Sequence, residues 1–463
     1  MKTFNIIMLH FIVMLANCCK EGSKSCEVLI EDSQNLMKGQ LKLNNEMGSI
    51  QPEIKNGYFI FSPVLNKPEY FVLTIGNKNY TLYLAPGYNI SIPSGTTNPG
   101  NISRFSGKGA LLNNYILNDI YMSQCIQNKT NFDSIYSLAP SDFIYCIDSL
   151  YNIKTLNLED FIIENGIKEE VFISTERKRI YYSSAIEKNQ YYRDHIFLTN
   201  EVPILNERYD SYLEKADFND PDLLHLPDYK KFLSTYFERV GLQDYNSLQN
   251  KGKRIHFTEY SYAWAKRMAY EKKVKNYVLY KIMDSYVNST PIDYSRNLVL
   301  DFFKECTDEN YKYLIDKSSK ALDKLKKGMP APEFTFTDVN GIKVRLSDFR
   351  RRIVYIDVWN SNCSPCFKEF PVMEKLINKY SNKEIVFIGI SYDSDKTLWE
   401  KTMKAINLKG IQLFANGWDS QFGRDYMVWS NPRFILIDKN GNFISARAPK
   451  PSEIVDTLIE QNL

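Results

Sequence analysis

Residues 353–371 read I-V-Y-I-D-V-W-N-S-N-C-S-P-C-F-K-E-F-P, and this stretch decides the fold of the C-terminal part of the chain. An apolar, β-branched run ends at Trp359, and Cys363 and Cys366 follow after a few polar residues. Beyond Cys366, apolar side chains recur at intervals of three and four residues, which is typical of a helix. The stretch therefore predicts a buried strand, a short turn, and a helix with a dithiol at its amino-terminal end.

This placement of the dithiol favours redox chemistry. The first turn of a helix has unpaired N–H groups and the positive end of the helix dipole, so a thiol there loses its proton more readily. The pKa of a free cysteine, near 8.5, can fall to roughly 3.5–7.5 in such a setting, and only the thiolate attacks a disulfide. A C-x-x-C near alternating strands and helices is also typical of a redox motif.

Two structural roles compete with the redox role of the dithiol. Half of a zinc site is the first, but structural zinc takes four ligands. The sequence has no second C-x-x-C pair, and all four histidines lie upstream of residue 257. A permanent structural disulfide is the second, but a bond within one helical turn would constrain very little of the chain. We therefore expect redox catalysis without a metal ion or another cofactor.

Length and charge restrict the possible partners. The 463 residues suffice for about three domains of the usual ~150 residues each. Lys and Arg number 58 against 55 Asp and Glu, which gives a formal net charge of +3, and no long basic block occurs. This balance argues against a nucleic-acid partner.

The amino terminus predicts export. Lys2 precedes an apolar run over residues 4–16, which is too short to span a bilayer and is typical of a secretory signal peptide. A cysteine directly after Leu15-Ala16-Asn17 resembles the lipobox of bacterial lipoproteins, in which that cysteine is lipidated. Leu15 favours Cys18 as the lipidated residue, whereas lipidation at Cys19 would leave an even number of other cysteines outside the dithiol. An ordinary signal peptide without lipidation is the remaining alternative.

Lipidation at Cys18 would place the protein in the cell envelope, anchored to a membrane by its lipid and facing the periplasm or the cell surface. No later apolar run reaches the ~18–20 residues of a transmembrane helix. Export into an oxidising space permits structural disulfides, and Cys125 with Cys146 is one candidate pair.

The chain divides into a predicted signal peptide over residues 1–18 and three further regions. Short strands, with a hairpin turn at Asn56-Gly57, predict a small antiparallel β domain over residues 26–107, as a sandwich or open barrel. Helical periodicity dominates residues 110–327, and residues 260–287 form one candidate helix. A linker with Gly328 and two prolines follows, and strands alternating with helices predict an α/β fold over residues 328–463, with both sheet faces covered. The expected fold class is therefore multidomain.

Two parts of the chain resemble known families. The segments G-Y-F-I-F, P-E-Y-F-V-L and L-Y-L-A-P-G-Y-N-I-S-I resemble the β domain of unknown function that often precedes thioredoxin-like domains in lipoproteins of the Bacteroidetes. The motifs of the C-terminal part resemble the TlpA/ResA-type disulfide reductases, which have a thioredoxin-like fold: Ala331-Pro332, Asp357-Val358-Trp359, Cys363-Ser-Pro-Cys366 and Asn431-Pro432. Peroxiredoxins share this fold, but Ile356 and Asn360 occupy the Pro and Thr places of their motif, which argues against a thiol peroxidase.

The resemblance implies a catalytic role for four residues. Cys363 would be the nucleophile that attacks a substrate disulfide, and Cys366 would resolve the resulting mixed disulfide. Asp357 falls where thioredoxins keep a buried acid beneath the second cysteine, and Glu369 falls where ResA-type reductases keep one. Either carboxylate could take the proton from Cys366, and burial would raise its pKa toward the working range. Both could instead be ordinary surface or capping groups.

Four further residues are expected to border the substrate. The resemblance implies a cis peptide bond before Pro432, which would face the dithiol and present the backbone to an extended substrate. Asn362 stands where the family usually has Trp, and Asn431 replaces the usual apolar residue or Thr. Together with Trp359, these residues are expected to contact the client protein.

The expected function is that of a thiol-disulfide oxidoreductase. It would reduce protein disulfides in the periplasm through its Cys-Ser-Pro-Cys dithiol and receive electrons from an upstream donor. An oxidase, which works in the opposite direction, would have a reduction potential well above about −200 mV. The alternative from another class is a surface or periplasmic binding lipoprotein in which the thioredoxin fold is mainly a scaffold.

Overall fold

The computed structural model describes residues 24–31, 41–45, 48–75, 78–93, 104–129, 132–206, 208–249, 256–268, 271–289, 296–418 and 420–463. The predicted signal peptide and the lipidation candidates Cys18 and Cys19 lie outside these residues. Of the helices in the described ranges, none is both long enough and apolar enough to cross a membrane. The chain forms two compact units, Met1–Arg239 and Val240–Leu463.

The first unit begins with two larger sheets and a two-stranded pair. The strands are β1 (Lys24–Ser25), β2 (Glu27–Glu31), β3 (Leu41–Asn45), β4 (Gly48–Ile50), β5 (Glu53–Lys55), β6 (Tyr58–Phe61), β7 (Val64–Leu65), β8 (Glu69–Ile75), β9 (Lys78–Leu84), β10 (Asn89–Ile92) and β11 (Ser106–Lys108). One sheet has the order β11-β10-β2-β6-β5, the other β4-β3-β8-β9, and β1 pairs with β7. The β10 and β2 strands pair in parallel, which corrects the expectation of a purely antiparallel domain. Such a pair needs a long connection instead of a hairpin, and here most of the β region lies between the two strands.

The predicted hairpin turn at Asn56 and Gly57 joins β5 to β6. Both residues have positive φ, 52° and 78°, as a two-residue type I′ turn requires. Inward-facing side chains of the two sheets, among them Val28, Leu43 and Phe61, belong to one hydrophobic cluster. The β region is therefore a sandwich, one of the two predicted forms.

Helices fill the rest of the first unit. They are α2 (Ala110–Lys129), α3 (Phe132–Tyr136), α4 (Pro140–Asn165), α5 (Glu170–Thr199), the 3-10 helices η2 (Tyr209–Lys215) and η3 (Pro221–His225), and most of α6 (Pro227–Gln249). Gly166 after α4 and Asn200 after α5 both have the left-handed conformation that is common at helix ends. Cys146 on α4 is a free thiol, so the disulfide with Cys125 that the sequence suggested is wrong.

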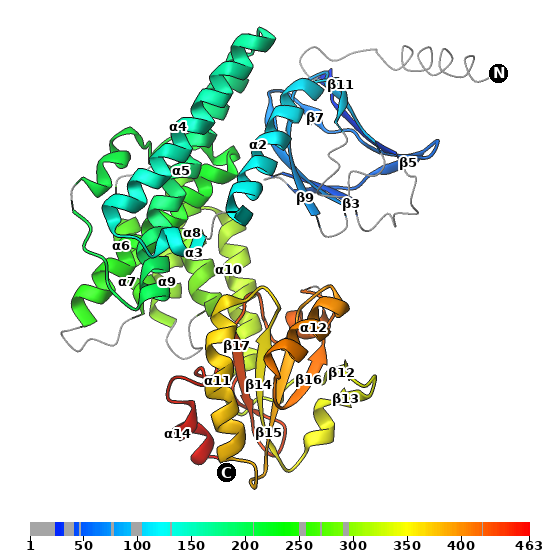
Figure 1. The fold of residues 1–463 in the computed structure, drawn as a ribbon, viewed down its shortest axis with the longest axis vertical. Helices are drawn as coiled ribbons and strands as arrows, with labels where there is room; N and C mark the ends of the chain where they lie inside the picture. The colour runs from blue at the N-terminus through cyan, green and yellow to red at the C-terminus, as the bar shows by residue number, and fades with distance from the viewer. Residues whose placement is uncertain are drawn as a thin grey trace. The chain divides into compact units, whose positions relative to one another are not determined.

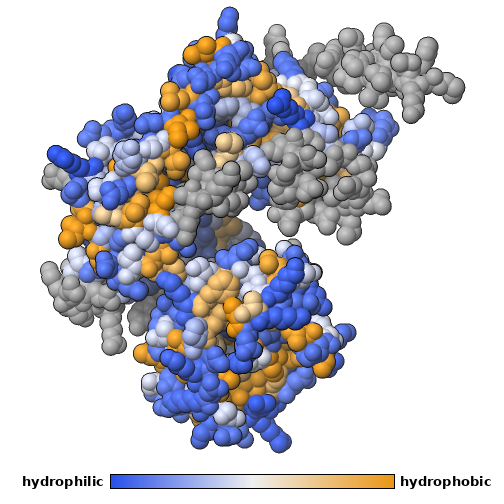
Figure 2. Space-filling view, viewed as in Figure 1, coloured by the Kyte–Doolittle hydropathy of each residue, from blue (hydrophilic) through white to orange (hydrophobic). Residues whose placement is uncertain are grey.

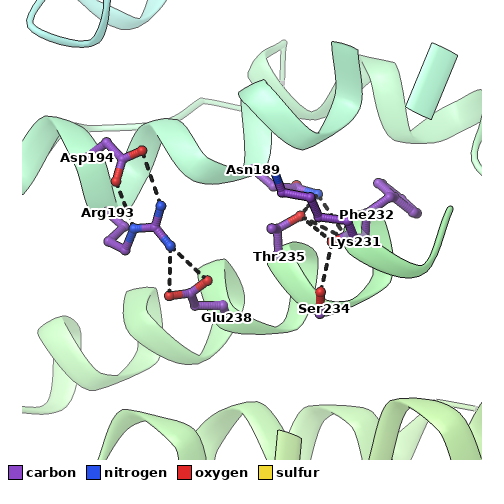
Figure 3. Close-up of polar contacts among 8 residues, drawn as sticks. All are labelled: Asn189, Arg193, Asp194, Lys231, Phe232, Ser234, Thr235 and Glu238. Carbon is purple, nitrogen blue, oxygen red and sulfur yellow. Dashed lines mark hydrogen bonds and ion pairs between the residues drawn. The ribbon is translucent and has the colours of Figure 1, made fainter. Parts of the chain in front are cut away.

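Polar contacts join α5 to α6 (Figure 3). The guanidinium of Arg193 donates to Asp194 on its own helix and to Glu238 on α6, at 2.7 to 3.2 Å. One helical turn away, the Asn189 side-chain amide donates to the Thr235 hydroxyl at 3.3 Å. These pairs fix how the two helices align along their length.

A buried ion network connects the β sandwich to the helices of the first unit. The Tyr70 hydroxyl on β8 donates to Glu176 on α5. Arg179 donates through Nε to Glu176 at 2.9 Å and through Nη2 to Asp119 on α2 at 2.8 Å. Because Glu176 is fully buried, its charge depends on these partners for compensation.

The outer side of α4 carries several exposed apolar side chains. Tyr145, Ile153, Leu156 and Ile163 are each at least half exposed, and their spacing places them along one side of the helix. Figure 2 shows hydrophobic surface interspersed with hydrophilic surface on the face viewed. Exposed polar residues, among them Asn152 and Asp160, lie between these apolar side chains, so this side of the helix is mixed.

The second unit begins within α6 and continues with α7 (Phe257–Arg267), α8 (Lys272–Ser289), α9 (Arg296–Glu305), α10 (Glu309–Leu322) and η5 (Asp323–Leu325). The prediction of one helix over residues 260–287 is wrong, because the backbone becomes extended at Met268 and ends α7. Asp308 begins α10 by accepting the backbone N–H groups of Asn310 and Tyr311, as N-cap residues do.

A seven-stranded sheet with helices packed on it completes the second unit (Figure 1). Its elements are β12 (Thr335–Asp338), β13 (Lys343–Arg345), η6 (Leu346–Phe349), β14 (Ile353–Trp359), α11 (Ser364–Lys379), β15 (Ile385–Ser391), α12 (Lys396–Ile406), β16 (Ile411–Phe414), α13 (Gln421–Asp425), β17 (Arg433–Ile437), β18 (Phe443–Ser445) and α14 (Val455–Glu460). The strand order is β13-β12-β16-β15-β14-β17-β18. Strand β14 pairs in parallel with β15 and antiparallel with β17. The predicted alternation of strands and helices is confirmed.

The two central strands are buried along their whole length. Every residue of β14 and β15 is buried, as continuous apolar runs predict for strands covered on both faces. On one face, Met373 of α11 and Val455 of α14 join Ile353 and Tyr355 in a hydrophobic cluster. Because α11 starts shortly after β14 ends, the dithiol lies at the carboxyl end of this central strand.

Candidate active site

The dithiol lies where β14 leads into α11. Cys363 is the N-cap residue of the helix, and Pro365 occupies its first turn, where the missing N–H costs nothing. The backbone N–H of Cys366 donates to Sγ of Cys363 at 3.2 Å. A disulfide joins Cys363 to Cys366, so the structure shows the oxidised pair.

The two cysteines differ in their access to solvent. Cys363 is 5% exposed and Cys366 is 0% exposed. Both belong to a cluster with Trp359, Trp399 and Met403. An incoming disulfide can therefore reach Cys363 first, whereas Cys366 is enclosed beside it.

Trp359 belongs to the core and not to a client surface. Its side chain is fully buried, and its indole N–H donates to Oε1 of Gln412 at 3.3 Å. Its ring meets the ring of Phe370 edge-on, with 5.5 Å between the centroids. Because a side chain without exposed surface cannot touch a client, the expectation that Trp359 binds substrate is corrected: it packs against the dithiol.

Asp357 is a buried acid on β14. Its side-chain oxygen Oδ1 has no hydrogen-bond partner among the described residues. Burial, and then the nearby charge of Glu369, raise the pKa of Asp357 to about 8, since both disfavour the ionised form. This carboxyl group is therefore mostly protonated at neutral pH while the disulfide is formed.

Glu369, on α11, has a different environment. Its side chain is buried, and its two oxygens accept hydrogen bonds from the Ser452 backbone N–H at 3.0 Å and the Ser452 hydroxyl at 2.8 Å. Each carboxyl oxygen of Glu369 therefore has a hydrogen-bond donor in Ser452. The structure thus places both predicted acids in the buried interior and gives hydrogen-bond donors to only one of them.

A cavity of about 210 Å³ adjoins Asp357. It is lined by residues of β14, α11 and the end of α12, and Gln412 forms part of its wall. Gly389 pairs with Asp357 across the sheet, and a Cβ added there would lie only 2.2 Å from Oε1 of Gln412. The absence of a side chain at Gly389 thus makes room for Gln412, which in turn holds the indole of Trp359.

The peptide bond between Asn431 and Pro432 is cis, as the resemblance implied. Both residues are partly exposed, and Asn362 is exposed. The Nδ2 atom of Asn431 has no hydrogen-bond partner in the described part of the chain. These three positions remain candidates for client contact.

Arg433 connects the strand after Pro432 to a helix. Its side chain is buried, and its Nη2 donates to the Asn288 carbonyl in the last turn of α8 at 2.9 Å. Burial lowers the pKa of Arg433 to about 10, and the negative end of the helix dipole favours the cation. A helix from outside the sheet therefore supports the segment that carries the cis proline.

The sequence did not predict three polar side chains that form hydrogen bonds to parts of this site. Ser452 orients Glu369, Arg433 supports the cis proline, and Asp393 accepts hydrogen bonds from Ser361 in the loop before the dithiol. Only Asp393 carried a local signal, because a polar Ser-x-Asp follows the buried run of β15.

Comparisons with known proteins agree with this geometry. The family model described as Redoxin matches residues 326–457. Thiol-disulfide oxidoreductase ResA of Bacillus thuringiensis subsp. konkukian (strain 97-27) is 33% identical over 122 residues, which are 26% of this chain and 69% of that protein. The ResA of Geobacillus kaustophilus (strain HTA426) is 32% identical over 114 residues, 25% of this chain and 64% of that one.

A solved structure, the thioredoxin domain of a thiol-disulfide oxidoreductase from Bacteroides vulgatus, is 26% identical. The match covers 30% of this chain and 99% of that one, with a TM-score of 0.28. The family model covers the seven-stranded sheet and its dithiol, and not the preceding β sandwich.

Proposed function

This chain belongs to the TlpA/ResA-like family of thioredoxin-fold thiol-disulfide oxidoreductases, and we propose that it reduces disulfides of client proteins through Cys363 and Cys366. The observation that carries the proposal is the N-cap position of Cys363, whose Sγ accepts the Cys366 backbone N–H. In the reduced protein the same hydrogen bond and the helix dipole favour the Cys363 thiolate.

The proposed exchange has two bond changes. The Cys363 thiolate attacks one sulfur of the client disulfide, a mixed disulfide forms, the client S–S bond breaks, and the released client thiolate takes a proton from water. Cys366 then gives its proton to the ionised form of Asp357, the minor form at neutral pH, and the Cys366 sulfur attacks Cys363. This step closes the Cys363–Cys366 disulfide and releases the second client thiolate. Two electrons have passed to the client, and a dithiol donor returns them by the reverse exchange.

The two buried acids have different roles in this proposal. With a pKa of about 8 in the disulfide form, Asp357 holds a proton that it can give to the Cys366 thiolate when the donor reduces the disulfide. Glu369, held by Ser452, acts through its charge, which raises the pKa of Asp357. The adjoining cavity is large enough for water, which would exchange the proton of Asp357 with solvent.

We further propose that the protein works in the cell envelope, tethered by a lipid at Cys18 and facing the periplasm or the cell surface. The apolar run over residues 4–16 and the lipobox-like Leu15-Ala16-Asn17 support this location. Wild type should incorporate radiolabelled palmitate, and Cys18→Ser should lose at least about nine tenths of the label because the acceptor thiol is gone. Loss of label in Cys19→Ser alone would move the anchor to Cys19, and an unlabelled wild type would contradict lipidation.

Insulin reduction tests the proposed activity. With dithiothreitol as the donor, wild type should accelerate insulin reduction, and Cys363→Ser should abolish the acceleration because no nucleophile remains. Cys146→Ser, which removes a free thiol elsewhere in the chain, is the matched control and should stay active. A correctly folded but inactive wild type would favour the scaffold alternative.

Equilibration with glutathione should give a reduction potential below about −200 mV, whereas a value well above it would indicate an oxidase.

A further inference from the structure

The carboxylate of Asp393 reaches the loop that precedes the nucleophilic cysteine. Asp393 lies just after β15 and is buried. Its Oδ1 and Oδ2 accept the Ser361 backbone N–H at 3.0 and 3.1 Å, and its Oδ2 also accepts the Ser361 hydroxyl at 2.9 Å. Two segments that are 32 residues apart in the sequence are thereby joined beside the dithiol.

Asp393 is itself held in place by the end of the sheet. Ser391 is fully buried, and its hydroxyl donates to Oδ2 of Asp393 at 2.7 Å. The backbone N–H of Asp393 donates in turn to Oγ of Ser391 at 3.0 Å. The Tyr392 N–H donates to the Trp359 carbonyl at 2.9 Å, which continues the pairing of β15 with β14. The carboxylate is therefore attached to a rigid part of the fold.

The loop at residues 360–362 has few other anchors. The Asn362 N–H donates to Oδ1 of Asn360, and the Cys363 N–H donates to the Asn360 carbonyl, each at 3.1 Å. Both bonds stay within the loop and its junction with α11. Among the described residues, the N–H groups of Asn362 and Cys363 bond to Asn360 within the loop, and only the N–H of Ser361 bonds to a residue far away in the sequence.

We propose that Asp393 is a positioning residue that fixes the loop before Cys363 and so keeps its sulfur at the start of α11. The inference rests on the proposed function, because its consequence is faster attack by the Cys363 thiolate. Hydrogen bonds to a charged acceptor are stronger than neutral ones. Without the bond at Ser361, the remaining hydrogen bonds of the loop stay within the loop and its junction with α11. For part of the time, Cys363 then leaves the position in which its sulfur accepts the Cys366 N–H.

Two substitutions of Asp393 separate position from charge. Asp393→Ala removes every acceptor, so the reduced variant should react with iodoacetamide at Cys363 about tenfold more slowly at neutral pH, with the midpoint of its pH profile moved upward. Asp393→Asn keeps one oxygen for the Ser361 N–H and should restore most of the rate. Asp395→Ala is the matched control, because Asp395 caps α12 by accepting the Thr397 and Leu398 N–H groups and does not touch the loop.

Hydrogen exchange at the Ser361 amide gives a readout that does not depend on activity. It should be slow in wild type and Asp393→Asn, and about tenfold faster or more in Asp393→Ala. Equal exchange in all three proteins, or the same slow alkylation in both Asp393 variants, would overturn the proposal. If wild type exchanges no disulfide at all, the proposed function fails, yet the amide exchange still decides whether Asp393 fixes the loop.

Discussion

Cys366→Ser should turn the protein from a catalyst into a trap that holds its client through a mixed disulfide at Cys363. Cys366 is fully buried beside Cys363, so its attack on the mixed disulfide is intramolecular and needs no diffusion. Intramolecular thiols of this kind correspond to effective concentrations far above the millimolar level of an external thiol. Release of the client should therefore slow at least about a thousandfold.

The trap is measured by mixing reduced Cys366→Ser with a disulfide-bonded protein and separating the products without reductant. Mass spectrometry should find the client on Cys363. The double variant Cys363→Ser/Cys366→Ser should capture nothing, and Cys146→Ser/Cys366→Ser should capture as much as the single variant. Adducts at Cys146, or release at the wild-type rate, would contradict the assigned order of attack.

Much of the fold around this pair follows from local sequence patterns. The apolar runs of β14 and β15 predict fully buried strands, and the structure buries each residue of both. In α12, Asp395 supplies the N-cap and Asn407 the left-handed end, and both residue types are common at these positions. These signals are local because hydrogen bonding within a helix or turn depends on nearby residues.

The contacts that the sequence did not predict join distant segments. Ser452 is 83 residues from Glu369, and Ser361 is 32 residues from Asp393, so no spacing in the chain indicates either pair. The burial of Trp359 could not be read from its place at a strand end, because it depends on Gln412 and Phe370 from β16 and α11. The division of 260–287 into α7 and α8 also lacked a glycine or proline as a signal.

Asp357→Asn should change how the stability of the oxidised protein depends on pH. In wild type the pKa of Asp357 is raised from 3.8 to about 8 in the fold, so above pH 4 the folded state keeps a proton that the unfolded chain releases. The free energy of unfolding therefore falls as the pH rises from about 4 to about 8. At about 1.36 kcal/mol per pKa unit, this loss is on the order of 4 kcal/mol by pH 7.

Urea unfolding of the oxidised proteins between pH 4 and pH 8 measures this loss. Asparagine does not titrate, so the difference between Asp357→Asn and wild type should grow in favour of the variant across that range. Asp456→Asn is the control, because Lys379 and Tyr380 lower the pKa of Asp456. The contribution of Asp456 to the free energy of unfolding is therefore lost only as the pH falls below about 4. Parallel curves for wild type and Asp357→Asn would contradict a buried, protonated Asp357.

The same variant tests which acid handles the proton of Cys366. Asp357→Asn should slow resolution of the mixed disulfide about a hundredfold and leave alkylation of Cys363 nearly unchanged, because it removes the proton acceptor and not the nucleophile. Glu369→Gln keeps an oxygen for Ser452 and should lower the pKa of Asp357, since the Glu369 charge helps to raise it. Its resolution rate should then stay close to wild type, with a pH midpoint below about 8. If Glu369→Gln resolved the mixed disulfide slowly and Asp357→Asn resolved it at the wild-type rate, the two roles would be reversed. Wild-type resolution rates in both variants would exclude both acids from the proton transfer.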